Sequence, residues 1–191
     1  MPNYLISVTV VADDIEAARA QWARLGFALA PGGVIALGCA RVVLRDSAEA
    51  GPGFGAFGIV TAREPDAPDA ASASHPNGAR ALAAVAGQHE NPADHAEALG
   101  RLAGQREMRA TSAGLELKFA NARLEALTRP AFAQRYADAG DGASRALVFA
   151  ASDLAKTRAF LRAAGLAFDE KFGRLVLAER PIGYVLAFEA Q

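Results

Sequence analysis

Hydrophobic and polar positions follow the same order in two stretches of the chain, 139 residues apart. Residues 8–26 read VTVVADDIEAARAQWARLG, and residues 147–165 read LVFAASDLAKTRAFLRAAG. In each stretch a short apolar run, typical of a strand, leads to an aspartate, Asp14 or Asp153, and a glycine follows twelve residues later. Aspartate is a preferred helix N-cap and glycine a preferred terminator, so each stretch predicts a strand followed by a helix.

The two predicted helices also share the set of positions that should face the core. These positions are Ile15, Ala18, Trp22 and Leu25 in the first helix and Leu154, Thr157, Leu161 and Ala164 in the second. Their spacing of three and four residues places each set on one helix face. An internal repeat explains the match. The alternative is chance, because short amphipathic helices resemble one another.

The segment between these stretches predicts a third, weaker copy. Residues 81–86 are small and apolar, and Asn91-Pro92 is a typical helix start that is followed by a stop at Gly104. Residues 115–119 alternate apolar and charged side chains, which predicts a half-exposed strand, and residues 123–127 predict another. Further short strands are predicted after the first and third helices. The fold class that we expect is therefore α+β, with three repeated βαβββ-like units.

Changes in composition divide the chain into four parts. The first unit covers residues 1–62, and a linker over residues 63–78 ends in a His-Pro-Asn-Gly turn. The second unit covers residues 79–130 and the third residues 145–190. The linker is predicted because it has prolines and small polar residues but no periodicity.

Composition and charge narrow the classes of function. Hydrophobic residues make up 52% of the chain, enough for a packed core. The 20 basic and 21 acidic side chains nearly cancel and form no patch, so we expect neither a nucleic-acid nor a membrane partner. The single cysteine, Cys39, cannot form an internal disulfide, and the N-terminus does not read as a signal peptide. We therefore expect a cytoplasmic protein.

Several short motifs together resemble a known superfamily. They are LISVTVVADDIEAA at residues 5–18 with Leu-Gly-Phe at 25–27, HPNGAR at 75–80, Asn-Pro at 91–92 with a helix ending at Gly104, and RLEALT at 123–128. This combination resembles the glyoxalase/bleomycin resistance/dioxygenase modules, the vicinal oxygen chelate superfamily, and its glyoxalase-like branch. The resemblance implies paired βαβββ modules whose curved mixed sheets form a cup around a ligand. It also implies, in typical members, a divalent metal held by His, Gln or Glu side chains, whereas other members bind small molecules without metal.

The chain departs from the metal-binding pattern of that superfamily. The four ligand positions fall at Ser7, Gly58, Ala84 and Glu125, and only Glu125 has a ligand-type side chain. A divalent site normally needs three or more protein ligands. We therefore expect no metal and no other cofactor, with a divalent metal as the alternative if the assumed register is shifted.

Four residues are candidates for ligand binding. His75 and Asn77 lie in the linker turn, where they would either contact a ligand at the mouth of the cup or only stabilise the turn. Arg123 and Glu125 alternate onto one face of their strand, so Glu125 is either a ligand contact and weak candidate for a general base, or a solvated residue. Glu189 has a comparable place on the last strand of the third unit.

Two other patterns favour structural interpretations. His89 and His95 are six residues apart, which one helix face would not bring together, so we expect surface histidines and not a metal site. Gly53 to Gly58 match G-x-G-x-x-G, but the strand-like residues that follow favour a glycine-rich hairpin over a dinucleotide site.

The leading functional hypothesis is a glyoxalase-like protein that binds a small apolar or aromatic metabolite without the usual metal centre. The first alternative is a metal-dependent lyase, isomerase or ring-cleaving dioxygenase of the same superfamily. The second is a degenerate, non-catalytic interaction protein. Because three units leave one without an internal partner, we also expect a homodimer.

Overall fold

A computed structural model describes residues 3–48, 57–63, 74–104, 107–136 and 145–191. In these residues the fold is α+β, with a four-stranded and an eight-stranded mixed sheet and four α-helices. None of the described helices has the length and apolar character needed to cross a membrane.

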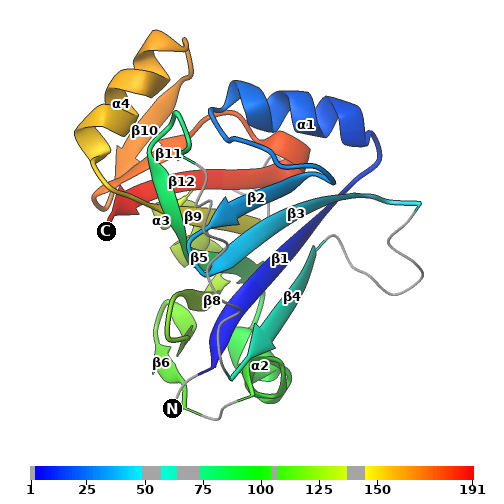
Figure 1. The fold of residues 1–191 in the computed structure, drawn as a ribbon. Helices are drawn as coiled ribbons and strands as arrows, with labels where there is room; N and C mark the ends of the chain where they lie inside the picture. Colours follow the sequence, from blue (N-terminus) through cyan, green and yellow to red (C-terminus); the bar gives the residue numbers. More distant parts are fainter. Residues whose placement is uncertain (1–2, 49–56, 64–73, 105–106, 137–144) are drawn as a thin grey trace.

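The smaller sheet, sheet A, comes from the N-terminal part of the chain (Figure 1). Its strands are β1 (Tyr4–Ala12), β2 (Val34–Leu37), β3 (Ala40–Asp46) and β4 (Phe57–Ala62), in the order β2-β3-β1-β4. Helix α1 (Ile15–Arg24) connects β1 to the β2–β3 pair. Strand β1 runs parallel to β3 and antiparallel to β4.

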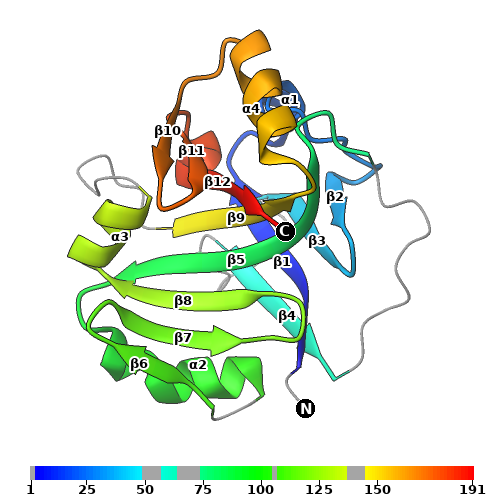
Figure 2. The same cartoon turned by 90° about the vertical axis from the view of Figure 1, so that its left-hand side faces the viewer.

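The larger sheet, sheet B, has the order β10-β11-β12-β9-β5-β8-β7-β6 (Figure 2). One half contains β5 (Ala79–His89), β6 (Arg109–Thr111), β7 (Gly114–Lys118) and β8 (Arg123–Thr128), and the other β9 (Arg145–Ala151), β10 (Phe168–Lys171), β11 (Arg174–Leu177) and β12 (Tyr184–Ala190). In each half the first strand pairs in parallel with the last, and an antiparallel β5–β9 pairing joins the halves.

The remaining helices lie between these strands. They are a 3-10 turn (Pro92–His95) that leads into α2 (Ala96–Ala103), α3 (Arg129–Arg135), α4 (Leu154–Ala163) and a short 3-10 turn (Pro181–Gly183). Helix α4 packs on one face of sheet B, toward the core shared with sheet A, and α3 lies on the other (Figure 2). We call this second surface the α3 face.

The two matching stretches of sequence have matching local structure. Asp14 accepts a hydrogen bond from the Ala17 amide, and Asp153 accepts from two amides of α4, so both predicted N-caps are confirmed. The strand pairing corresponds as well, because β1 runs parallel to β3 as β9 runs parallel to β12. The first segment differs in one respect: residues 27–33, which would match β10, make only an isolated bridge between Ala30 and Val34.

The main hydrophobic core lies between the two sheets and includes α1 and α4. Phe27 is at its centre, with ring centroids 5.1 Å from Trp22, 4.8 Å from Phe149 and 6.1 Å from Phe188. A second core covers part of the α3 face, where alanines and valines of sheet B pack against Phe132 and Tyr136.

One predicted detail of the helices is wrong: Ala164 is exposed, because α4 gives way to a loop in which Leu166 is buried instead. Helix α2 buries Gly100 and Ala103 and leaves Leu102 39% exposed. Helix α3 begins after Thr128, whose side chain caps it, and has proline in its first turn.

Candidate functional site

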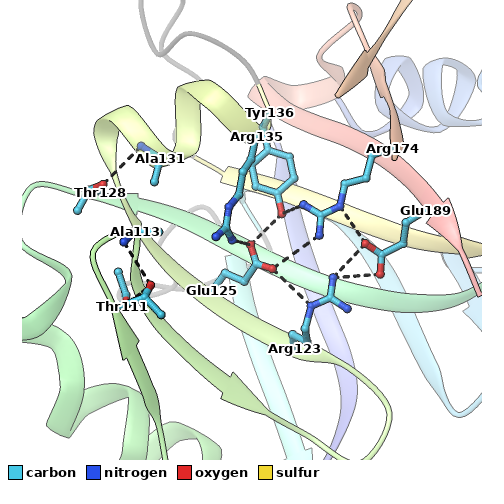
Figure 3. Close-up of polar contacts among 11 residues, drawn as sticks. Thr111, Ala113, Arg123, Glu125, Thr128, Ala131, Arg135, Tyr136, Arg174 and Glu189 are labelled. Atoms are coloured by element: carbon cyan, nitrogen blue, oxygen red, sulfur yellow. Dashed lines mark hydrogen bonds and ion pairs between the residues drawn. The ribbon is translucent and has the colours of Figure 1, made fainter. Parts of the chain in front are cut away.

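The most concentrated group of charges lies on the α3 face around Glu125 of β8 (Figure 3). The Glu125 side chain is only 2% exposed. One carboxylate oxygen accepts hydrogen bonds from the Arg135 guanidinium at 3.1 Å and from the Tyr136 hydroxyl at 3.0 Å. The other lies 3.4 Å from Arg123 Nε and 3.9 Å from Arg174 Nη2. Three arginines therefore surround one buried carboxylate.

A second carboxylate extends this group, which we call the Glu125 cluster: Arg123, Glu125, Arg135, Tyr136, Arg174 and Glu189. Both oxygens of Glu189 accept from Arg123 Nη2 at 3.0 Å, and one also accepts from Arg174 Nε at 2.9 Å. Glu189 is 19% exposed, so its side chain lies within the cluster and not in open solvent. The cluster brings together β8, α3, β11 and β12 and holds three positive against two negative groups.

The ionisation of the cluster follows from these contacts. Burial opposes the charge on Arg123, but the Glu189 and Glu125 carboxylates outweigh it and raise the pKa of this arginine. Burial, together with the nearby Glu125 carboxylate, raises the pKa of the Tyr136 hydroxyl, which therefore stays protonated and donates. Arg174 donates to the same hydroxyl at 3.1 Å and lies 5.4 Å from the centre of the Tyr136 ring.

A small cavity of about 110 Å³ opens beside Glu125 and Arg135. Its lining comes from β6, β7, β8 and α3 and consists of Arg109, Thr111, Gly114, Leu115, Glu116, Glu125, Leu127 and Arg135. Arg109 is exposed and has no ion-pair or hydrogen-bond partner among the described residues. The cavity therefore combines apolar leucines with two guanidinium groups that can bind an anionic group.

The residues do not fit the divalent metal that the family resemblance implies. Among the described residues no group of three or more His, Cys, Asp or Glu side chains is arranged to hold a metal ion. Glu125, the only ligand-type side chain at the four family positions, is surrounded by guanidinium groups, and these would repel a cation. We therefore derive no chemistry through a metal here.

His75 and Asn77 lie apart from the Glu125 cluster, so of the four candidates the structure brings together only Arg123 and Glu125. Asn77 is fully buried, and its side chain donates to the Leu25 carbonyl at 3.0 Å and accepts from the Ala79 amide at 3.0 Å. His75 accepts from the Ala28 amide at 3.0 Å through Nδ1. Its Nε2 lies 2.8 Å from the Ala36 carbonyl, which can only accept, so the proton is on Nε2. Both side chains thus tie the linker turn to backbone groups of the first segment.

The buried setting of His75 makes stability depend on pH. Burial lowers its pKa from the ordinary value, and its bond to Ala36 only partly opposes that shift. Neutral His75 makes its full contribution to the free energy of unfolding above the unfolded-state pKa of about 6.5. This contribution is lost as the pH falls from that value through the lower pKa of the folded state. We therefore expect the free energy of unfolding to fall between pH 7.5 and pH 5. Urea unfolding across this range should show a smaller decrease for His75→Gln, and an unchanged slope would contradict the assignment.

The expectation that His89 and His95 stay apart is wrong. Their ring centroids are 4.3 Å from each other, because β5 ends at His89 and the following 3-10 turn folds His95 back onto it. Burial, His95 and Arg145 together lower the pKa of His89. The helical spacing argument failed because the two residues belong to different elements.

Sequence reasoning did not identify Arg135, Tyr136 or Arg174 as part of the site. Arg135 and Tyr136 are at the end of α3, and Arg174 is on β11; no local motif connects either element with β8. Of the glycine-rich motif, residues 53–56 lie outside the described residues, and β4, a strand, begins at Phe57.

Comparison with known proteins finds no family model that matches the chain, and no curated protein matches it.

Proposed function

We propose that the chain is a glyoxalase-like protein that binds a small apolar or aromatic metabolite on the α3 face without a metal centre. In this proposal the two halves of sheet B are paired βαβββ modules of the vicinal oxygen chelate type. The strand order supports it, because each half pairs its first and last strands in parallel and β5–β9 joins the halves. The homodimer also stays a prediction, which light scattering at micromolar concentration would test.

One observation carries the functional part of the proposal: the Glu125 position is surrounded by arginines and not by metal ligands. Where a metal would polarise the oxygens of a substrate, guanidinium groups can bind them by hydrogen bonds and charge. The ligand would therefore carry an acidic group, held by Arg109 and Arg135, with its apolar part against Leu127 of the small cavity.

A thermal-shift panel of small carboxylates, sulfonates and phosphates tests this proposal. We expect at least one aromatic or aliphatic acid to raise the melting temperature, because a ligand that binds only the folded state stabilises it. Arg135→Gln should abolish the shift. Arg101→Gln is the matched control, since Arg101 lies on α2 and pairs only with the exposed Glu97. Stoichiometric binding of Zn²⁺ or Mn²⁺ that is lost in Glu125→Gln would overturn the metal-free proposal.

A second candidate, a non-catalytic interaction protein, has its own supporting observation. Glu125 already has four protein partners, and α3 buries the small side chains of sheet B against Phe132 and Tyr136. The cluster would then hold α3 in place and bind nothing. The absence of any Arg135-dependent shift across the ligand panel would favour this candidate.

A further inference from the structure

A second, larger cavity of about 610 Å³ lies between α1 and the β2–β3 pair of sheet A. It is lined by Ile15, Arg19, Gly32, Val34, Val43, Leu44, Arg45 and Asp46. Ligand sites in proteins are commonly about 300–1,000 Å³ and mostly apolar, with a few placed polar groups. Four apolar residues, two arginines and Asp46 give this cavity a mixed apolar and charged lining, and it is separate from the Glu125 cluster.

Arg19 of α1 has hydrogen-bonding capacity that the chain does not use. Its Nη1 donates to the exposed Glu16 carboxylate at 2.6 Å. Its Nε is buried and has no partner, and no partner of its Nη2 is found among the described residues. Gly33 leaves room for this group, since a Cβ at that position would come within 3.3 Å of the Arg19 Nε. The unpaired Nη2 is not among the buried atoms, so it is the donor of this guanidinium that an acceptor from outside the chain can reach.

The equivalent arginine of the third segment shows what such an acceptor does. Arg158, 139 positions after Arg19, lies on α4 as Arg19 lies on α1. Its Nε and Nη2 donate to the two oxygens of Glu170 at 2.8 and 3.0 Å. This two-pronged contact uses the same two nitrogens that Arg19 leaves unpaired, and it is a favoured geometry for an arginine–carboxylate pair.

The first segment cannot supply the corresponding carboxylate from the same place. Glu170 is on β10, the strand that has no counterpart in the first segment. The position 139 residues before Glu170 is Pro31, which carries no acidic group. Arg19 therefore lines a cavity without the carboxylate partner that its equivalent, Arg158, has.

We propose that this cavity binds a small organic carboxylate with an apolar body. The carboxylate would bind the accessible Nη2 of Arg19, one of the two nitrogens that hold Glu170 at Arg158. The apolar body would lie against Val34 and Val43, and the exposed Arg45 adds a second positive charge opposite the single carboxylate of Asp46. The site is additional to the one on the α3 face, and it does not depend on the function proposed there.

Benzoate is a suitable probe because it combines a carboxylate with an apolar ring. Binding is followed by nuclear magnetic resonance of the arginine Nε–H groups, which reports Arg19 directly. We expect benzoate to shift the Arg19 Nε–H signal in a saturable manner, and neutral benzamide to leave it in place. No shift with benzoate, or an equal shift with benzamide, would overturn the proposal.

Matched variants separate this site from the others. Arg19→Gln removes the guanidinium, so benzoate affinity, followed by the amide signals of β2 and β3, should fall about tenfold. Arg158→Gln removes the equivalent but already paired arginine, and Arg101→Gln removes an exposed arginine of α2; both should leave benzoate affinity unchanged. A loss in either variant equal to that in Arg19→Gln would refute the assignment.

Discussion

Replacing Glu125 by glutamine is expected to lower the free energy of unfolding by about 3 kcal/mol, the largest effect of any single change at the site. The substitution keeps the shape of the side chain but removes the charge that Arg135, Arg123 and Arg174 share. It also places amide donors against guanidinium donors at a position that is only 2% exposed. The three arginines are then left partly buried, with Glu189 as the only carboxylate of the cluster.

Urea unfolding followed by circular dichroism measures this effect. Glu97→Gln is the control, because the Glu97–Arg101 pair is 83% and 72% exposed, and such pairs contribute less than about 1 kcal/mol. A double-mutant cycle with Arg135→Met adds a sharper criterion. Arg135→Met should lower the free energy of unfolding less in the Glu125→Gln background than in the unmutated protein, because the carboxylate that Arg135 binds is already absent. Additive effects would show that the two side chains do not interact.

Removing the Asn77 side chain is expected to cost nearly as much, about 2–3 kcal/mol in Asn77→Ala. The side chain is fully buried, and its loss leaves the Leu25 carbonyl and the Ala79 amide without partners. Asn77→Asp should be at least as harmful, because its second oxygen would face the Leu25 carbonyl with no proton between them. Thermal unfolding measures both variants.

Asn91→Ala is the matched control, since the Asn91 amide is exposed and donates only to the Asp94 side chain. If Asn77→Ala were as stable as Asn91→Ala, the linker turn would not depend on the buried amide. Asn77 would then remain open to the role that the sequence suggested, a contact with ligand.

The sequence predicts best the features that depend on a few neighbouring residues. The caps at Asp14 and Asp153 are such features, because the hydrogen bonds form within three residues of the aspartate. Period-two alternation likewise put Arg123 and Glu125 on one face of β8, where they make contact. These inferences required no knowledge of the rest of the chain.

The sequence could not predict the features that depend on distant pairings. The Arg123–Glu189 pair joins residues 66 positions apart, and it forms only because β12 and β9 lie in the same sheet as β8. The sequence argument kept His89 and His95 apart because it considered a single helix. In the structure His89 ends a strand and His95 ends a 3-10 turn, and their rings are in contact. The absence of a counterpart for β10, on which the second cavity depends, is equally a property of pairing and not of periodicity.

The position of Phe27 in the core has a consequence for how the chain folds during its synthesis on the ribosome. Phe27 is made early, but two of its four ring neighbours, Phe149 and Phe188, belong to β9 and β12, which are made much later. The apolar face of the first segment therefore stays uncovered until both strands have been made, and exposed apolar surface and unpaired strand edges favour aggregation. The nascent chain is consequently a stronger candidate for chaperone capture than the finished protein.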